Sequence, residues 1–144
     1  GSIAAFKTVQ FISDLVKEKY EIEVMLTPSA AKFLTPTSIS ALTKKKTYID
    51  VFDDDPGCIT HVDIVKDADL FLADTYLFDG HENHHAHFTA GEAGKIAKAA
   101  GAKRLILSHL PEEGDYDLLK AQAQKQAGEN IQVSVAKIGD TYQI

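Results

Sequence analysis

The chain has 144 residues, a length that fits one compact domain. Its hydrophobic content of 44% and charged content of 25% are those of an ordinary soluble protein. The net charge of −6 argues against nucleic acid as a main partner, and no apolar run is long enough to cross a membrane. The single cysteine, Cys58, excludes an internal disulfide. With no targeting signal visible, a reducing, cytoplasmic setting is expected.

The first half of the sequence predicts alternating helices and strands. In chain order, the expected elements are an amphipathic helix that Ser2 can cap, a strand over 20–27, a helical stretch over 29–43 and a strand over 47–52. Val9 and Val16 belong to an apolar series with helical spacing, which indicates that the first helix buries one face. Pro36 interrupts the helical stretch, and either Thr35 or Thr37 can cap the helix that restarts there.

The second half carries clearer element boundaries. In chain order, the expected elements are a brief helix within 61–69, a strand over 69–78, a helix after Thr89, a strand over 103–109, a helix starting at Gly114 or Asp115, and a hairpin with strands at 131–136 and 140–144. Thr89 and Glu92 have the spacing of a capping box, and Gly101 is typical of a left-handed helix end. The run over 69–78 is almost continuously apolar, which predicts a strand covered on both faces.

The alternation of strands and helices predicts the fold class. Strands that return through helices to parallel neighbours form a three-layer α/β sandwich. We therefore expect a single domain over 1–144, with a mainly parallel sheet of five or six strands and a C-terminal hairpin. Met25 and the aromatic side chains are expected in its core.

Four of the six histidines lie in HENHHAHF, residues 81–88. Imidazoles at this density can bind a metal ion, or they can be solvent-exposed loop residues that bind nothing. His81, His84 and His85 are interpreted as loop residues rather than ligands.

Residues 1–72 contain three sequence motifs whose residues and order are characteristic of one protein family. They are GSIAAFK at 1–7, EVMLTPSAAKFLTP at 23–36 and HVDIVKDADLFL at 61–72. These stretches resemble the flavin-dependent cysteine decarboxylase family, which includes phosphopantothenoylcysteine decarboxylase. The resemblance implies a flavodoxin-like fold that binds FMN.

The same resemblance implies roles for four residues. Gly1 and Ser2 match the loop that receives the flavin phosphate at a helix N-terminus. Ser29 matches a second polar contact in the flavin site, and His61 matches the catalytic histidine. ADTYLF at 73–78 departs from the family's Pro-Ala-Ser-Ala-Asn-Thr segment, so His61 is expected to be vestigial and FMN the less expected cofactor.

Residues 68–144 resemble a different family. ADLFLADTYLFDG, HHAHFTAGEAGKIAKAAGAKRLILSHLP and the terminal hairpin are similar to the C-terminal half of a metallo-β-lactamase-fold hydrolase. The resemblance implies that Asp74, His87 and His109 are metal ligands, and such carboxylate and imidazole groups suit a divalent metal such as zinc. The alternative is that the three are polar residues left without their former partners. The superfamily's His-x-His-x-Asp-His signature occurs nowhere in the sequence.

The two resemblances overlap in ADLFLA, residues 68–73. A crossover within this strand preserves its burial pattern, so the chain is interpreted as a recombined, artificial chimera without a complete active site or native activity. The rival account of its origin is a natural fusion or an unusual family member. Two alternatives are a metal-binding protein or weak metal-dependent hydrolase, and an FMN-binding module. No counterpart of the flavoprotein family's first strand precedes Gly1, which leaves a gap beside the strand over 20–27. We therefore expect a homo-oligomer, formed by strand or segment exchange.

Overall fold

The computed structural model describes residues 5–49, 64–82 and 87–142. The chain divides into two compact units, residues 1–60 and 61–144. Every strand pairing in the described residues is parallel, which confirms the expected α/β class. The single domain over 1–144 stays a prediction. Within the described ranges, no helix has the length and apolar character needed to span a bilayer.

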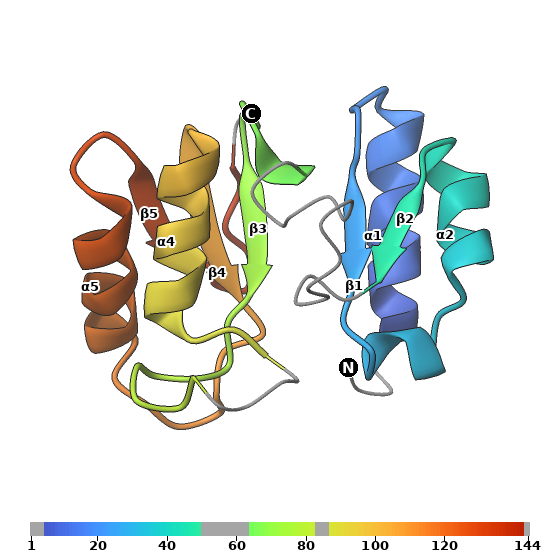
Figure 1. The fold of residues 1–144 in the computed structure, drawn as a ribbon. Helices are drawn as coiled ribbons and strands as arrows, with labels where there is room; N and C mark the ends of the chain where they lie inside the picture. Colours follow the sequence, from blue (N-terminus) through green and yellow to red (C-terminus); the bar gives the residue numbers. More distant parts are fainter. Residues whose placement is uncertain (1–4, 50–63, 83–86, 143–144) are drawn as a thin grey trace, which may run out of the picture. The chain divides into compact units, whose positions relative to one another are not determined.

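The first unit alternates helices with two short strands (Figure 1). Its elements are α1 (Ala5–Lys17), β1 (Val24–Leu26), the 3₁₀ helix η1 (Ala30–Lys32), α2 (Pro36–Thr43) and β2 (Thr47–Ile49). β1 and β2 pair in parallel, with Met25 opposite Tyr48. The Thr35 side-chain oxygen accepts a hydrogen bond from the Ser38 N–H at 3.2 Å, and Pro36 is the first helical residue. Of the two caps that the sequence allows for α2, the structure therefore uses Thr35.

The second unit is a three-stranded parallel sheet with two helices on one face (Figure 1). Its elements are β3 (Phe71–Asp74), α4 (Ala90–Ala100), β4 (Arg104–Ser108), α5 (Tyr116–Ala127) and β5 (Gln132–Val135), and the strand order is β3-β4-β5. At the start of α4, Thr89 Oγ1 accepts from the Glu92 N–H at 3.2 Å, and the Glu92 carboxylate accepts from the Thr89 N–H at 2.8 Å. Gly101 ends this helix with a φ of 70°. The predicted capping box and left-handed helix end are both confirmed.

The sheet differs from the expected one in two respects. In the part of the chain that is described, the five strands form a two-stranded sheet and a three-stranded sheet, rather than a single sheet of five or six strands. The second hairpin strand is not formed over 140–142, and 143–144 lie outside the described residues. Instead, the Asp140 N–H donates to the Lys137 carbonyl oxygen at 3.2 Å, and the Tyr142 hydroxyl donates to the Val135 carbonyl oxygen at 3.2 Å. A turn and a side-chain hydrogen bond take the place of the expected β-ladder.

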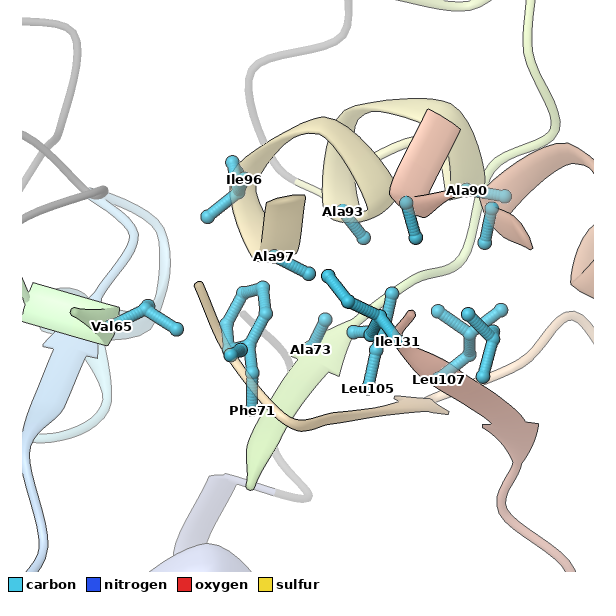
Figure 2. Packing of buried hydrophobic residues seen from close by; sticks show 14 of the residues in the cluster. Val65, Phe71, Ala73, Ala90, Ala93, Ile96, Ala97, Leu105, Leu107 and Ile131 are labelled. Carbon is cyan, nitrogen blue, oxygen red and sulfur yellow. The ribbon is translucent and has the colours of Figure 1, made fainter. Parts of the chain in front are cut away.

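Small side chains allow α4 and α5 to pack closely on the sheet. The buried apolar residues of this core are Val65, Phe71, Ala73, Ala90, Ala93, Ile96, Ala97, Ala100, Ala102, Leu105, Leu107, Leu119, Ala123, Ala127, Ile131, Val133 and Val135. In Figure 2, Ala93 and Ala97 of α4 face the side chains of the strands. Leu105 and Leu107 of β4 have no exposed surface, so the central strand anchors the core.

Several side chains expected in the core lie on the surface. The exposed aromatic residues include Phe6, Phe11, Tyr20, Phe33, Tyr76 and Tyr116. β3 also alternates in burial instead of being covered on both faces, because Phe71 and Ala73 are buried while Leu72 is 44% exposed. The helices cover one face of this sheet, so alternate residues of β3 reach the core.

Gly94 marks a close approach between α4 and α5, and its substitution tests that packing. A Cβ atom here would lie well inside van der Waals contact with the Ala123 carbonyl oxygen and 3.1 Å from the Ala127 backbone nitrogen. Because backbone atoms cannot rotate aside, we expect Gly94→Ala to lower the free energy of unfolding by about 1–3 kcal/mol despite alanine's better helix propensity. Urea denaturation followed by circular dichroism measures this difference.

Lys95→Ala is the control, because Lys95 occupies the neighbouring exposed position of α4. It should change the free energy of unfolding by less than about 0.5 kcal/mol. Equal effects of the two substitutions would contradict the tight contact at Gly94.

Candidate metal centre

A carboxylate and two imidazoles meet at the carboxyl ends of β3 and β4. Oδ1 of Asp74 lies 2.9 Å from Nδ1 of His87 and 3.0 Å from Nδ1 of His109. The two imidazole rings contact each other edge-on, with centroids 5.0 Å apart and planes at 67°. An ionised carboxylate can only accept hydrogen bonds, so both Nδ1 atoms donate to Asp74 in this arrangement. The three residues considered as metal ligands from the sequence therefore lie together.

The parallel register of β3 and β4 positions Asp74 and His109. Asp74 is the last residue of β3 and pairs with Ser108, the last residue of β4. His109 follows immediately. The Thr75 N–H donates to the Ser108 carbonyl oxygen at 2.8 Å, and the Ser108 hydroxyl donates to the Ala73 carbonyl oxygen at 2.9 Å. These bonds continue the pairing past the strand ends and keep the two backbones side by side.

Backbone hydrogen bonds before α4 bring His87 to the same place. The Phe88 N–H donates to the Asp74 carbonyl oxygen at 3.3 Å, and the Phe88 carbonyl oxygen accepts from the Leu77 N–H at 3.4 Å. Leu77 also forms an isolated parallel bridge with Thr89, the N-cap of α4. The segment before the helix is thereby attached to the end of β3, and His87 lies beside Asp74.

His109 has an unusual backbone conformation. Its φ is 52°, in the left-handed region, which few residues other than glycine adopt, although histidine is found there more often than most. The chain turns here at the end of β4, and the imidazole meets Asp74. A left-handed conformation costs about 1–2 kcal/mol for an ordinary residue, and such strain is concentrated at functional sites.

The donor set and its spacing suit a divalent metal ion such as zinc. One ligand atom from each of Asp74, His87 and His109 lies within 4.8 Å of the others. Zinc bonds of about 2.0–2.1 Å in tetrahedral geometry place neighbouring ligand atoms about 3.3 Å apart. The separations of 2.9 Å and 3.0 Å between Asp74 Oδ1 and the two imidazole nitrogens are close to that value. The His87 side chain is 16% exposed and the His109 side chain 43%, so the cluster opens to solvent on the His109 side.

The other histidines of the loop are not part of this cluster in the described residues. His81 is exposed, and His84 and His85 lie outside the described residues. Beside His81, the Gly80 N–H donates to the Glu82 carboxylate at 2.8 Å, and this hydrogen bond lowers the pKa of Glu82.

The flavin-site candidates are described only in part. Gly1, Ser2 and His61 lie outside the described residues. Ser29 is the partly buried N-cap of η1, shortly after β1, and its side chain makes no capping hydrogen bond to that helix. Ligands of α/β proteins often bind at the carboxyl ends of strands, but one hydroxyl does not define a flavin site. The roles of these four residues stay predictions.

Two residues of the histidine region were not among the candidates from the sequence. Tyr76 is 39% exposed, and its ring contacts the imidazoles of His87 and His109. Asp79 accepts a hydrogen bond from the Gly91 N–H at 2.6 Å and so ties the loop to the first turn of α4. Residues two apart in an extended segment share a side, so the spacing from Asp74 was a signal for Tyr76. No comparable signal pointed to Asp79.

Comparison with known proteins relates the first part of the chain to flavoproteins. The Flavoprotein family model matches residues 1–79, more than half of the chain, and the chain belongs to this family. A probable phosphopantothenoylcysteine decarboxylase from Streptococcus mutans is 37% identical over 97 residues, or 67% of this chain and 52% of that protein. The chain thus spans about half the length of this relative. The crystal structure of the cypemycin decarboxylase CypD shares the fold, with a TM-score of 0.59 at 19% identity over 92% of this chain and 77% of CypD.

Metallo-hydrolases match another part of the chain. The probable metallo-hydrolase YhfI from Bacillus subtilis is 40% identical over 75 residues, or 51% of this chain and 30% of that protein. The crystal structure of YhfI, a metallo-β-lactamase fold protein, matches with a TM-score of 0.51 at 32% identity, over 56% of this chain and 33% of YhfI. The chain therefore combines flavoprotein-like and metallo-β-lactamase-like segments. Both resemblances expected from the sequence are confirmed.

Replacing His109 by glycine or alanine tests its left-handed backbone. Both changes remove the imidazole, but only glycine adopts a φ near 52° without steric cost. We expect His109→Gly to be more stable than His109→Ala by about 1 kcal/mol, measured by denaturation of the metal-free protein.

Ser108 provides the matched control, because it is the last residue of β4, directly before His109, and its φ is not positive. At this position alanine should be at least as stable as glycine, since glycine loses more chain entropy on folding. If alanine is also the more stable residue at position 109, the left-handed conformation does not persist in solution.

Proposed function

We propose that the chain is a recombined, artificial α/β protein that binds one divalent metal ion, such as zinc, and has no native catalytic activity. Asp74, His87 and His109 are the ligands in this proposal. The observation that carries it is one Asp74 oxygen within 3.0 Å of an imidazole nitrogen of each histidine. Similarity to two unrelated families over different segments supports the recombined origin.

Each of the three side chains has a distinct task. Without metal, Asp74 holds both imidazoles nearby by accepting their hydrogen bonds, and its negative charge favours a cation. On binding, metal bonds would replace these hydrogen bonds. The mostly buried His87 is the less mobile ligand, and the more exposed His109 lies where an ion enters. A bound zinc ion supplies Lewis acidity and lowers the pKa of a coordinated water toward neutrality.

The missing signature motif supports the lack of native activity. The metallo-β-lactamase resemblance implies a two-metal centre that also uses His-x-His-x-Asp-His, and these 144 residues contain no such motif. In two-metal hydrolysis the ions together stabilise the attacking and leaving oxygens. A single site would forfeit that cooperation, so weak metal-dependent hydrolysis is the alternative activity.

FMN binding is a second candidate, favoured by membership of the Flavoprotein family. Gly1, Ser2 and Ser29 would contact the flavin, and His61 would be a vestige of the catalytic site. ADTYLF at 73–78 counts against this candidate, because it departs from the segment that the resemblance implies for holding flavin.

A cytoplasmic setting and self-association complete the proposal. β1 pairs with β2 alone in the described residues, and an open strand edge can accept a strand or segment from a second copy. Light scattering on the purified chain measures the assembly state, and a monomeric mass would remove this element of the proposal.

Zinc titration tests the proposed metal site. We expect one ion per wild-type chain and a rise in melting temperature, because a ligand that binds the folded state stabilises it. His87→Ala and His109→Ala should each weaken binding by about tenfold or more. Even the loss of a residue that only hydrogen-bonds to a metal ligand lowers metal affinity by about tenfold. His81→Ala, in the same loop, should bind like wild type. Absence of both bound metal and thermal stabilisation in the wild type would refute the site.

Visible absorption tests the flavin candidate. If the decarboxylase site is incomplete, the purified chain should be colourless and should leave the spectrum and fluorescence of added FMN unchanged. A stoichiometric yellow complex that Ser29→Ala weakens would instead establish the second candidate.

A further inference from the structure

We propose that Tyr76 is a positioning residue for the metal-binding imidazoles, its ring holding His87 and His109 in place beside Asp74. This inference rests on the proposed metal site. The Tyr76 ring centroid lies 5.3 Å from that of His87 and 5.4 Å from that of His109, with an interplanar angle of 41° to each. The three rings form a closed triangle, because the two imidazoles are 5.0 Å apart. Aromatic pairs at these separations attract each other.

The backbone on both sides of Tyr76 is held firmly. Thr75 is fully buried, and its N–H donates to the Ser108 carbonyl oxygen at 2.8 Å. On the other side, the Leu77 carbonyl oxygen accepts from the Ala90 N–H at 3.0 Å. Tyr76 therefore projects from a rigid segment, and its ring is a fixed surface against which more mobile side chains can rest.

Such a surface limits how far the imidazoles can tilt. A hydrogen bond from Nδ1 to Asp74 constrains the position of a ring more than its tilt, so the ring can still rock about that bond. His109 is the more exposed of the two and has the greater freedom to lose. A flat ring beside both imidazoles restricts this rocking, so less conformational entropy is lost when an ion binds.

Core packing alone does not account for Tyr76. Its residue surface remains 39% exposed, although the adjacent Thr75 is completely buried. The ring contacts that it makes are with the two imidazoles of the candidate site. The proposed role belongs to the ring face, so phenylalanine should replace tyrosine, whereas leucine should fill space without positioning the imidazoles.

Three variants test the proposal. Tyr76→Phe keeps the ring, Tyr76→Leu removes it, and Tyr20→Leu is the control at a similarly exposed tyrosine of the first unit. Zinc affinity is measured by competition titration, and the ligand geometry is followed by the visible spectrum of bound cobalt(II). We expect Tyr76→Leu to weaken zinc binding by about tenfold and to alter the cobalt spectrum. Tyr76→Phe and Tyr20→Leu should match wild type in both.

Proton NMR of the metal-free protein provides a readout that does not depend on metal binding. Nuclear Overhauser contacts from the Tyr76 ring to both imidazoles are expected in the wild type, and carbon relaxation should show more mobile imidazoles in Tyr76→Leu. Lost contacts in the wild type, or unchanged ring mobility in Tyr76→Leu, would overturn the positioning role even if no metal binds. Wild-type affinity in Tyr76→Leu would also overturn it, as would equally weak binding by Tyr76→Phe, which would assign the effect to the hydroxyl. A wild-type chain that binds no metal refutes the proposed function separately.

Discussion

The parallel register between β3 and β4 is the constraint on which the rest of the second unit depends. Phe71 and Ala73 pair with Leu105 and Leu107, and all four side chains belong to the core beneath α4 and α5. A shift of β3 by one residue would turn Phe71 and Ala73 away from the helices. The same register places Asp74 opposite the residue before His109. The requirement to bury apolar side chains therefore also determines which polar groups meet at the sheet edge.

Packing across the overlap of the two resemblances joins the flavoprotein-like and metallo-β-lactamase-like segments in one core. Val65 precedes the overlap at 68–73, yet it is buried in one cluster with the residues of α4 and β4. The Asp67 N–H donates to the Ala100 carbonyl oxygen at 3.0 Å, and the Lys103 N–H donates to the Ala68 carbonyl oxygen at 3.0 Å. Residues from the flavoprotein-like segment thus satisfy backbone groups of the metallo-β-lactamase-like segment. The boundary between the two compact units falls earlier, between residues 60 and 61.

Features with local causes were predictable, and features that depend on distant partners were not. The capping box of Thr89 and Glu92 and the left-handed Gly101 follow from contacts within a few residues. The expected hairpin failed, because alternation in the last residues cannot reveal that the Tyr142 hydroxyl bonds back to β5. Tyr76 was assigned to the core by its residue type, although its neighbours in space are imidazoles. The candidate ligands were identified from the order of motifs along the chain. That order does not give the distances between their side chains.

The sequence by itself determined the α/β class, most helix ends and the identity of the polar residues that follow the strands, because hydrophobic spacing and capping chemistry act over short stretches. It also contained sequence motifs of two families. Only the tertiary structure decided that Asp74 meets His87 and His109, which lie 13 and 35 residues away along the chain. It also decided that Tyr76 lies against both imidazoles, and that His109 adopts a left-handed backbone. Such contacts depend on strand register and on packing between distant segments, which no local pattern specifies.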